Sequence, residues 1–140
     1  MATLERAIEI AVSAHKGQTD KAGNPYILHA LQVMLKGCTE KEKIVGVLHD
    51  VIEDTTWTLD TLRQEGFSDE IIQAIDALTR RKGEDYETFL SRTMQNDLAI
   101  RVKRYDLESN MDLTRLSQLT EHDIPRMNKY LNAYHKLTNK

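Results

Sequence analysis

The segment His49-Asp50-Val51-Ile52-Glu53-Asp54 places one imidazole and three carboxylates at the end of an otherwise apolar run. Ionisable side chains are expensive to bury there unless something compensates their charge. In a helix, Glu53 lies four residues after His49, so both side chains can share one face. The same spacing relates Asp54 to Asp50. A neutral imidazole with carboxylates suits a divalent cation such as Mn, Fe, Co, Ni or Zn, so the segment predicts a metal site.

Two further segments carry side chains that could complete this site. His29 follows the run Pro-Tyr-Ile-Leu, and Asp106 lies in a later helical segment. Asp106 and Asn110 are four residues apart, so both can face one point. If three helices converge there, two imidazoles and two carboxylates would hold the ion, with water or substrate oxygen in the remaining positions. We therefore expect one divalent cation, bound by His29, His49, Asp50 and Asp106.

Such a cation would support hydrolysis, because it lowers the pKa of a bound water and polarises an oxygen of the substrate. Glu53 or Asp54 could accept the proton of the attacking water or orient that water. The sequence does not separate the two acids. Lys21, Lys103 or Arg104 could balance the charge of an anionic substrate.

Helical periodicity dominates the chain, and no strand-like alternation of apolar and polar residues is visible. Thr39 is a suitable N-cap with Glu42 as its capping-box partner. The helix that follows is predicted to continue through Asp54 and, being apolar on nearly every side in its middle, to be the most buried. The predicted fold class is all-α, a compact bundle of about seven or eight helices. The other helices are expected at about 3–15, 25–36, 58–65, 69–78, 86–94, 98–107 and 123–137.

Composition limits the classes of function. The 140 residues carry a formal net charge of −3, with 40% hydrophobic and 29% charged residues. These values are typical of one globular domain, 1–140, and provide no basic excess for nucleic-acid binding. Cys38 is the single cysteine, so an intrachain disulfide is impossible. The N-terminus does not resemble a leader and no apolar run approaches ~20 residues, so we expect a cytoplasmic location and no membrane partner. The sequence leaves open whether the chain forms a homo-oligomer.

Three segments, in order, carry a resemblance to a known family. They are AHKGQTDKAGNPYILHALQV, GVLHDVIEDT and VKRYDLESNM, within roughly residues 10 to 115. Here the chain resembles the HD superfamily of metal-dependent phosphohydrolases, and within it the hydrolase domain of RelA/SpoT-type (p)ppGpp enzymes. The resemblance implies an all-helical hydrolase that removes the 3′-pyrophosphate of guanosine 3′,5′-bis(diphosphate), usually with manganese.

The resemblance also implies roles for single residues. The four expected metal ligands match the family's ligand positions. Glu53 and Asp54 match the acidic pair that positions the attacking water and assists proton transfer, and they are our predicted catalytic residues. Asn110 matches the residue that lines the nucleotide sugar and phosphate. We take Asn110, Lys21 and Lys103 as the predicted substrate-binding residues.

The segment that would contact the base departs from the family pattern. Asp20 stands where the family normally carries a basic residue, and Ala22 replaces a small hydroxyl residue. Two other functions therefore stay open: an HD-type nucleotide monophosphatase, and a nucleotide-binding sensor without turnover. A purely structural helical domain without a ligand is a third, and the cost of clustering uncompensated acids on an apolar helix argues against it. His15 is interpreted as a helix-end cation and Tyr26 as a packing residue. The run 80–82 is predicted to be an exposed linker.

Overall fold

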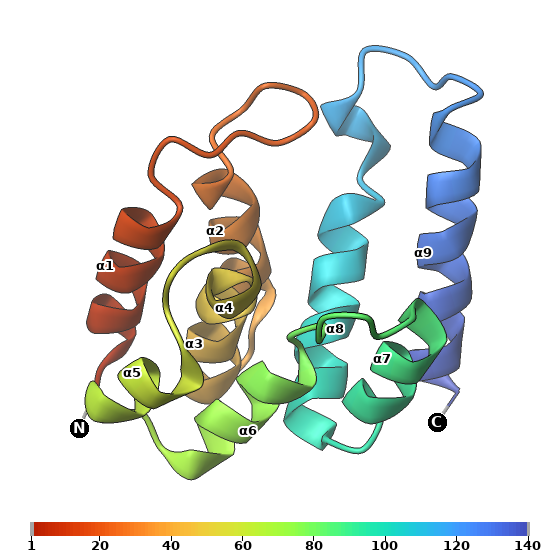
Figure 1. Cartoon of the computed structure of the whole chain (residues 1–140). Helices are drawn as coiled ribbons and strands as arrows, with labels where there is room; N and C mark the ends of the chain where they lie inside the picture. Colours follow the sequence, from red (N-terminus) through yellow and green to blue (C-terminus); the bar gives the residue numbers. More distant parts are fainter. Residues whose placement is uncertain (1, 140) are drawn as a thin grey trace.

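The computed structural model describes residues 2–139, which form nine α-helices and one short 3-10 helix (Figure 1). Within this range the chain has no β-strand, and a single isolated bridge joins Thr19 to Pro25. The all-α bundle is therefore confirmed. None of the helices described combines the length and apolar character needed to cross a bilayer. The helices are α1 Leu4–Ala14, α2 Ile27–Lys36, α3 Glu40–Leu48, α4 Val51–Asp54, α5 Leu59–Gln64, α6 Asp69–Ala77, α7 Tyr86–Thr93, α8 Asp97–Asn110, η1 Leu113–Arg115 and α9 Asp123–Thr138.

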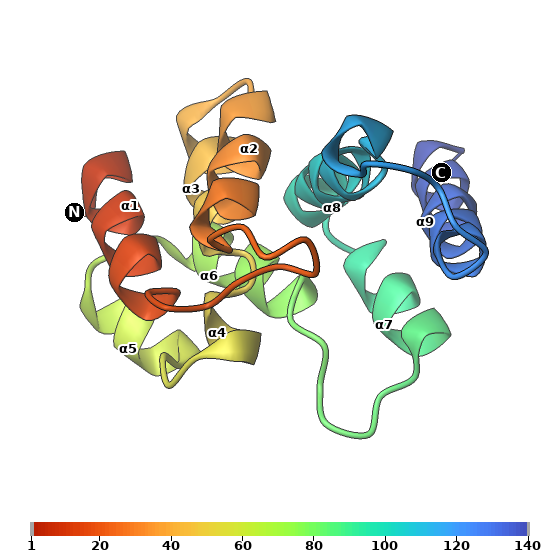
Figure 2. The ribbon, with the colours of Figure 1, turned by 90° about the horizontal axis from the view of Figure 1, so that it is seen from above.

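The helices form two groups that meet at α8. Helices α1, α2 and α6 pack against α3 and α5 packs against α6, while α7 and α9 pack beside α8 (Figures 1 and 2). The larger hydrophobic cluster belongs to the first group, and the smaller one belongs to the second. Helix α8 contributes Val102 to the larger cluster and Leu107 to the smaller one. The two faces of α8 therefore join both halves of the molecule.

Helix α3 is the buried centre of the bundle, as its apolar middle predicts. Every residue from Ile44 to Leu48 is buried. An added Cβ at Gly46 would lie 3.2 Å from the backbone of Met34, so α2 and α3 approach closely at this glycine. This close approach brings α2, which carries His29, beside α3, which ends just before His49.

The prediction of one continuous helix through Asp54 is wrong, because the chain breaks between α3 and α4. Asp50 has φ −106° and ψ 1°, outside the helical region. His49 Nδ1 donates to the carbonyl of Gly46 at 2.6 Å, and in an unbroken helix that carbonyl would accept from the amide of Asp50. Adjacent residues on a regular helix point in different directions, so the break is what allows His49 and Asp50 to face one point.

The predicted capping box of α3 is half right. Thr39 Oγ1 accepts from the amide of Glu42 at 3.1 Å, as expected. The Glu42 carboxylate instead accepts from the amide of Cys38 at 3.1 Å, from Tyr105 Oη at 2.7 Å and from Arg101 Nε at 3.0 Å. Glu42 therefore ties the start of α3 to α8, the helix that also carries Asp106.

Candidate metal centre

Three helical segments converge on one point and bring together His29, His49, Asp50 and Asp106. Ligand atoms of the first three residues lie within 4.8 Å of one another. Asp106 Oδ1 lies 2.9 Å from His29 Nε2 and 3.4 Å from His49 Nε2. Atoms that bind one ion at about 2.1 Å and at roughly right angles stand ~3 Å apart. The separations among His29, His49 and Asp50, and those of Asp106 from the two imidazoles, are therefore of the size that a shared cation requires.

Each imidazole is held through Nδ1, which leaves Nε2 facing the centre. His49 Nδ1 donates to the carbonyl of Gly46, and a carbonyl can only accept. His29 Nδ1 lies 3.1 Å from Ser109 Oγ, which donates its own proton to Gln32 Oε1 at 2.8 Å, so Nδ1 is the donor. A neutral ring protonated at Nδ1 carries its lone pair on Nε2. Outer hydrogen bonds of this kind orient histidines that bind metal ions.

The buried lone pair of His49 provides the test of whether a cation fits. Among residues 2–139, His49 Nε2 has no hydrogen-bond partner. Its polar neighbours are carboxylate oxygens, Asp50 Oδ2 at 3.0 Å and Asp106 Oδ1 at 3.4 Å. A lone pair directed at carboxylates is unfavourable, and a cation between these atoms removes the conflict. The residues present therefore fit a divalent ion.

The two carboxylates of the centre have opposite pKa shifts because their surroundings differ. Burial raises the pKa of Asp50 well above its usual value, and the charges of Asp106 and Asp54 raise it further. Burial acts on Asp106 in the same direction, but the Lys103 ammonium, 3.0 Å from Asp106 Oδ2, holds the pKa of Asp106 well below its usual value. Lys103 therefore stabilises the ionised form of Asp106, while ionisation of Asp50 is unfavourable until a positive charge lies beside it, as a bound cation would.

Tyr26, predicted to be a packing residue, contacts the centre. Its hydroxyl donates to Asp50 Oδ2, and its ring centroid lies 5.6 Å from that of His29. On the opposite segment, Asn110 Nδ2 donates to Asp106 Oδ1 at 3.2 Å, as the four-residue spacing predicts. The available signal for Tyr26 was its position three residues before His29, which places both on one side of a helical turn.

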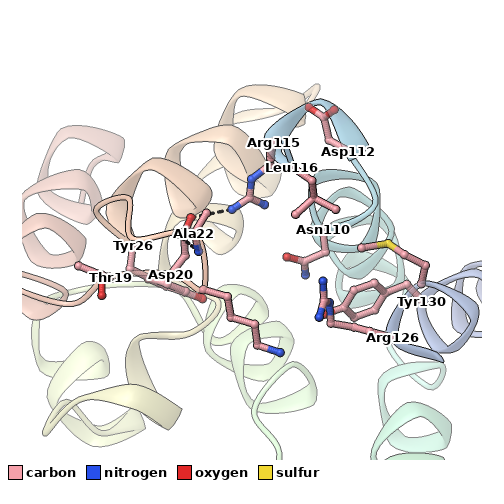
Figure 3. Close-up of a pocket in the computed structure, with 12 residues that line it drawn as sticks. Thr19, Asp20, Ala22, Tyr26, Asn110, Asp112, Arg115, Leu116, Arg126 and Tyr130 are labelled. Atoms are coloured by element: carbon pink, nitrogen blue, oxygen red, sulfur yellow. Dashed lines mark hydrogen bonds and ion pairs between the residues drawn. The ribbon is translucent and has the colours of Figure 1, made fainter. Parts of the chain in front are cut away.

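A cavity of about 310 Å³ adjoins the centre and is lined by Tyr26 and Asn110. Lys21, a predicted substrate-binding residue, also lines it. Figure 3 shows the α1–α2 loop forming one wall, with η1 and α9 opposite. The volume is at the lower end of the range of small-molecule sites. The residues that come from the opposite wall include Arg115, Leu116, Arg126 and Tyr130.

Asp20, which departs from the family pattern, pairs with Arg115 across this cavity (Figure 3). Asp20 Oδ2 lies 2.8 Å from Arg115 Nη2, and Oδ1 accepts from the amides of Ala22 and Asn24 at 2.9 Å and 3.0 Å. Burial opposes ionisation, but these amides and Arg115 lower the pKa of Asp20. Asp20 and Arg115 therefore neutralise each other at the place where the family normally carries a positive charge.

A second cavity, of about 170 Å³, opens on the centre itself. Partial burial raises the pKa of Glu53, which lines this cavity, and the Asp54 carboxylate raises it further. A carboxyl group with a raised pKa is better suited to proton transfer near neutral pH than an ordinary glutamate. The residues that line both this cavity and the centre are His49, Asp50, Glu53, Lys103 and Asp106.

Asp54 is held differently from Glu53. Its side chain is exposed and does not line the second cavity, although its charge raises the pKa of Asp50.

The backbone carbonyl of Asp54 accepts from Gln18 Nε2 at 3.2 Å, and Gln18 Oε1 lies 2.9 Å from His15 Nδ1. The prediction of His15 as a helix-end cation is wrong, since its ring is only 2% exposed and burial lowers its pKa. His15 and Gln18 instead brace α4.

Arg104, the third cation considered for the phosphate, lines neither cavity. Its guanidinium Cζ lies 5.7 Å from the centroid of the Tyr134 ring on α9. Lys103 and Asp106 are three residues apart and share the face of α8 toward the centre. Arg104 follows Lys103 directly and faces α9, so the structure removes it from the candidate site.

The chain belongs to the HD domain family. The family described as "HD domain" matches residues 7–105, which include three of the four expected ligands. The matched region ends one residue before Asp106.

Relatives and a solved structure support the same assignment. The guanosine-3′,5′-bis(diphosphate) 3′-pyrophosphohydrolase of Aquifex aeolicus is 29% identical over 120 residues, which are 77% of this chain and 17% of the relative. The enzyme with the same name in Borreliella burgdorferi is 39% identical over 82 residues, or 56% of this chain and 12% of the relative. The structure of a metazoan ortholog of SpoT that hydrolyzes ppGpp has a TM-score of 0.75 and 20% identity, covering 99% of this chain and 85% of that one. The resemblance to RelA/SpoT-type hydrolase domains is thereby confirmed.

Proposed function

We propose that this chain is a metal-dependent phosphohydrolase that removes the 3′-pyrophosphate of guanosine 3′,5′-bis(diphosphate). The observation that carries the proposal is the buried convergence of two Nε2 lone pairs with the carboxylates of Asp50 and Asp106. A cluster of this kind is costly to bury without a cation. The names of the Aquifex and Borreliella relatives support the substrate. The chain spans only 9% to 17% of the length of the first four relatives, so the substrate is part of the proposal.

The metal ligands in this proposal are His29, His49, Asp50 and Asp106. Two imidazoles and two carboxylates without a thiolate suit Mn²⁺ and equally Fe, Co, Ni or Zn. The choice of Mn²⁺ rests on the resemblance to the family. Cys38 is exposed before α3, where it leaves the ligand set unchanged.

The reaction would convert the substrate and one water into GDP and inorganic pyrophosphate. The bound cation would supply electrophilic assistance at the phosphoryl group and a lowered pKa for water. Glu53, with its raised pKa, would accept the proton of the attacking water, and Asp54 would orient that water. Lys103 keeps Asp106 ionised, and Tyr26 fixes Asp50. Oxygen from water joins the pyrophosphate, and the ribose 3′-hydroxyl is released.

The cavity of about 310 Å³ is the proposed site for the nucleoside. Its arginines are already paired with carboxylates, Arg115 with Asp20 and Arg126 with Asp123, so its net demand for an anion is low. Lys21 and Asn110 line the same cavity, and Asn110 also contacts Asp106. A nucleoside seated there would therefore present its ribose toward the centre.

The proposal is tested with purified protein reconstituted separately with Mn²⁺, Co²⁺, Zn²⁺ and Mg²⁺. Turnover of guanosine 3′,5′-bis(diphosphate) and of deoxynucleoside monophosphates is followed side by side by anion-exchange chromatography. We expect equal amounts of GDP and pyrophosphate from the first substrate. Release of inorganic phosphate from the monophosphates alone would favour the nucleotide monophosphatase.

Other results would contradict enzymatic activity. If the protein retains metal and binds nucleotide tightly but shows no turnover, it is a sensor. Glu53 and Asp54 would then not act in catalysis. A protein that binds neither metal nor nucleotide would be a structural helical domain. The cytoplasmic location, the homo-oligomer and the single domain spanning 1–140 stay predictions.

A further inference from the structure

The second cavity, of about 170 Å³, has a wall of positive charge beside the centre. Lys103 of α8 is one member. The others are Arg80, from the run predicted to be an exposed linker, and Lys129 of α9. Elements far apart in sequence thus direct three cations at the cavity that also exposes Asp50 and Asp106.

Aromatic rings hold the two lysines of this wall. Lys129 Nζ lies 4.1 Å from the centroid of Tyr86, and Lys103 Nζ lies 5.5 Å from that of Phe89. The two rings pack against each other with centroids 6.2 Å apart. A ring attracts a cation but carries no net charge, so its ring contact positions Lys129 without neutralising it, whereas Lys103 also pairs with Asp106 at 3.0 Å.

Arg80 belongs to a loop that is tied down despite its exposure. Arg80 Nε donates to the carbonyl of Glu84 at 2.8 Å. The Glu84 carboxylate accepts two hydrogen bonds of 2.9 Å from Arg92 of α7, which lower the pKa of Glu84 to about 2. Arg92 also donates to the carbonyl of Thr79 at 2.8 Å. The backbone on both sides of Arg80 is therefore fixed to α7.

The charges around this cavity are not balanced once a divalent ion is present. Three carboxylates, Asp50, Glu53 and Asp106, face three cations in its lining, so two positive charges of a bound ion stay uncompensated. Within residues 2–139, neither Arg80 nor Lys129 forms an ion pair with a carboxylate. Burial lowers the pKa of Lys129, and the nearby charge of Arg80 lowers it further. A polyanion in the cavity would relieve this repulsion.

We propose that Arg80, Lys103 and Lys129 form the subsite for the leaving pyrophosphate group. This inference rests on the proposed function and extends it by giving the substrate a direction across the centre. The nucleoside occupies the larger cavity, whose arginines are paired. The pyrophosphate lies in the smaller cavity, whose cations face the ion. Pyrophosphate therefore departs on the side of Arg80 and Lys129.

The test measures binding of inorganic pyrophosphate to protein loaded with one equivalent of Mn²⁺ and dialysed free of excess metal. Equilibrium dialysis with labelled pyrophosphate gives Kd, and protein-bound Mn²⁺ is measured in the same samples. Arg80→Ala and Lys129→Ala should each weaken binding about tenfold, the value of one charge-assisted hydrogen bond. Arg81→Ala and Lys136→Ala are matched controls, because each removes the same charge from the same loop or helix. They should change Kd less than about twofold.

Further binding measurements distinguish a failure of this subsite from a failure of the proposed hydrolysis. Guanosine, which is uncharged, should bind Arg80→Ala and Lys129→Ala as it binds the unaltered protein, and Lys129→Arg should retain pyrophosphate. If both alanine variants bind pyrophosphate with unchanged Kd, the subsite is overturned even when turnover is normal. If the protein turns over no nucleotide but these variants lose pyrophosphate binding, the subsite stands and the proposed hydrolysis fails.

Discussion

On the inner side of the metal centre, His29, His49 and Asp106 are 6% exposed or less, whereas Glu53 and Asp54 on the outer side are exposed. Each inner residue has a second contact that fixes it: Ser109 for His29, the Gly46 carbonyl for His49, and Lys103 together with Asn110 for Asp106. The acids of the outer side lie on a four-residue helix, α4, with fewer such contacts.

The difference in burial corresponds to two roles: the buried residues would bind the ion, and the exposed acids would take part in the reaction. A ligand set gains from rigidity, because its geometry decides affinity and the identity of the metal. An acid that exchanges protons with water must remain accessible. The fold meets both needs by building one side from long helices and the other from a short helix after a break. Substitutions on the two sides should therefore have different consequences.

The largest effect is expected from the inner side. Asp106→Asn should lose stoichiometric Mn²⁺ and reduce turnover by roughly 10³-fold or more, since it removes a charged oxygen that contacts both imidazoles. Metal content by mass spectrometry and turnover on the same sample provide the measurement. Asparagine is preferred to alanine because it retains a polar partner for buried Lys103; an unpaired charge there would cost about 3–5 kcal/mol. Full metal content in this variant would refute the ligand role of Asp106.

The second effect concerns the outer side. Glu53→Gln and Asp54→Asn should retain Mn²⁺ and the thermal midpoint while kcat falls by about 10²–10⁴-fold, the usual contribution of general acid–base catalysis. Glu87→Gln, at an exposed position of α7, is the matched control and should leave kcat unchanged. Loss of metal from either variant would show that holding and reacting are not separated as we describe.

The smallest effect is expected from residues that touch the ligands without binding the ion. Tyr26→Phe removes the hydroxyl that orients Asp50, and Ser109→Ala removes the acceptor of His29 Nδ1. Each should weaken Mn²⁺ binding by about 10–100-fold, measured by competition with a chelating dye. Tyr134→Phe loses a hydroxyl that bonds Glu108 and should leave metal affinity unchanged. If Tyr26→Phe and Ser109→Ala bind Mn²⁺ as tightly as the control Tyr134→Phe, then Tyr26 and Ser109 do not orient the metal ligands.

The helical fold could be predicted, because the 3.6-residue period that marks helices is local. The meeting of His29, His49, Asp50 and Asp106 was predicted from three motifs in the order of a known family, since His29 and Asp106 taken singly also have structural interpretations. The break after Leu48 could not be predicted, since it depends on the His49 side chain competing for the Gly46 carbonyl in the folded protein. Without the break, the spacing put His49 and Glu53 on one helical face.

Residues that reach the site from distant elements were also missed. Arg80 and Lys129 lie in polar stretches whose composition is typical of solvated surface. Only the packing of α7 and α9 against α8, with the Thr79 carbonyl bonded to Arg92 of α7, directs them to one cavity. Arg104 and Lys103 are chemically similar neighbours in sequence, and the rotation of α8 alone decides which one reaches Asp106.

The position of Asp106, one residue beyond the family match, has a practical consequence for work on related proteins. A fragment trimmed to the matched boundaries would retain both imidazoles and Asp50, yet lack the oxygen that lies between the two rings. It would also lose α9 and with it Lys129 and Tyr130. Such a fragment should bind Mn²⁺ more weakly than residues 1–140, so the absence of turnover in it would not contradict the proposed activity.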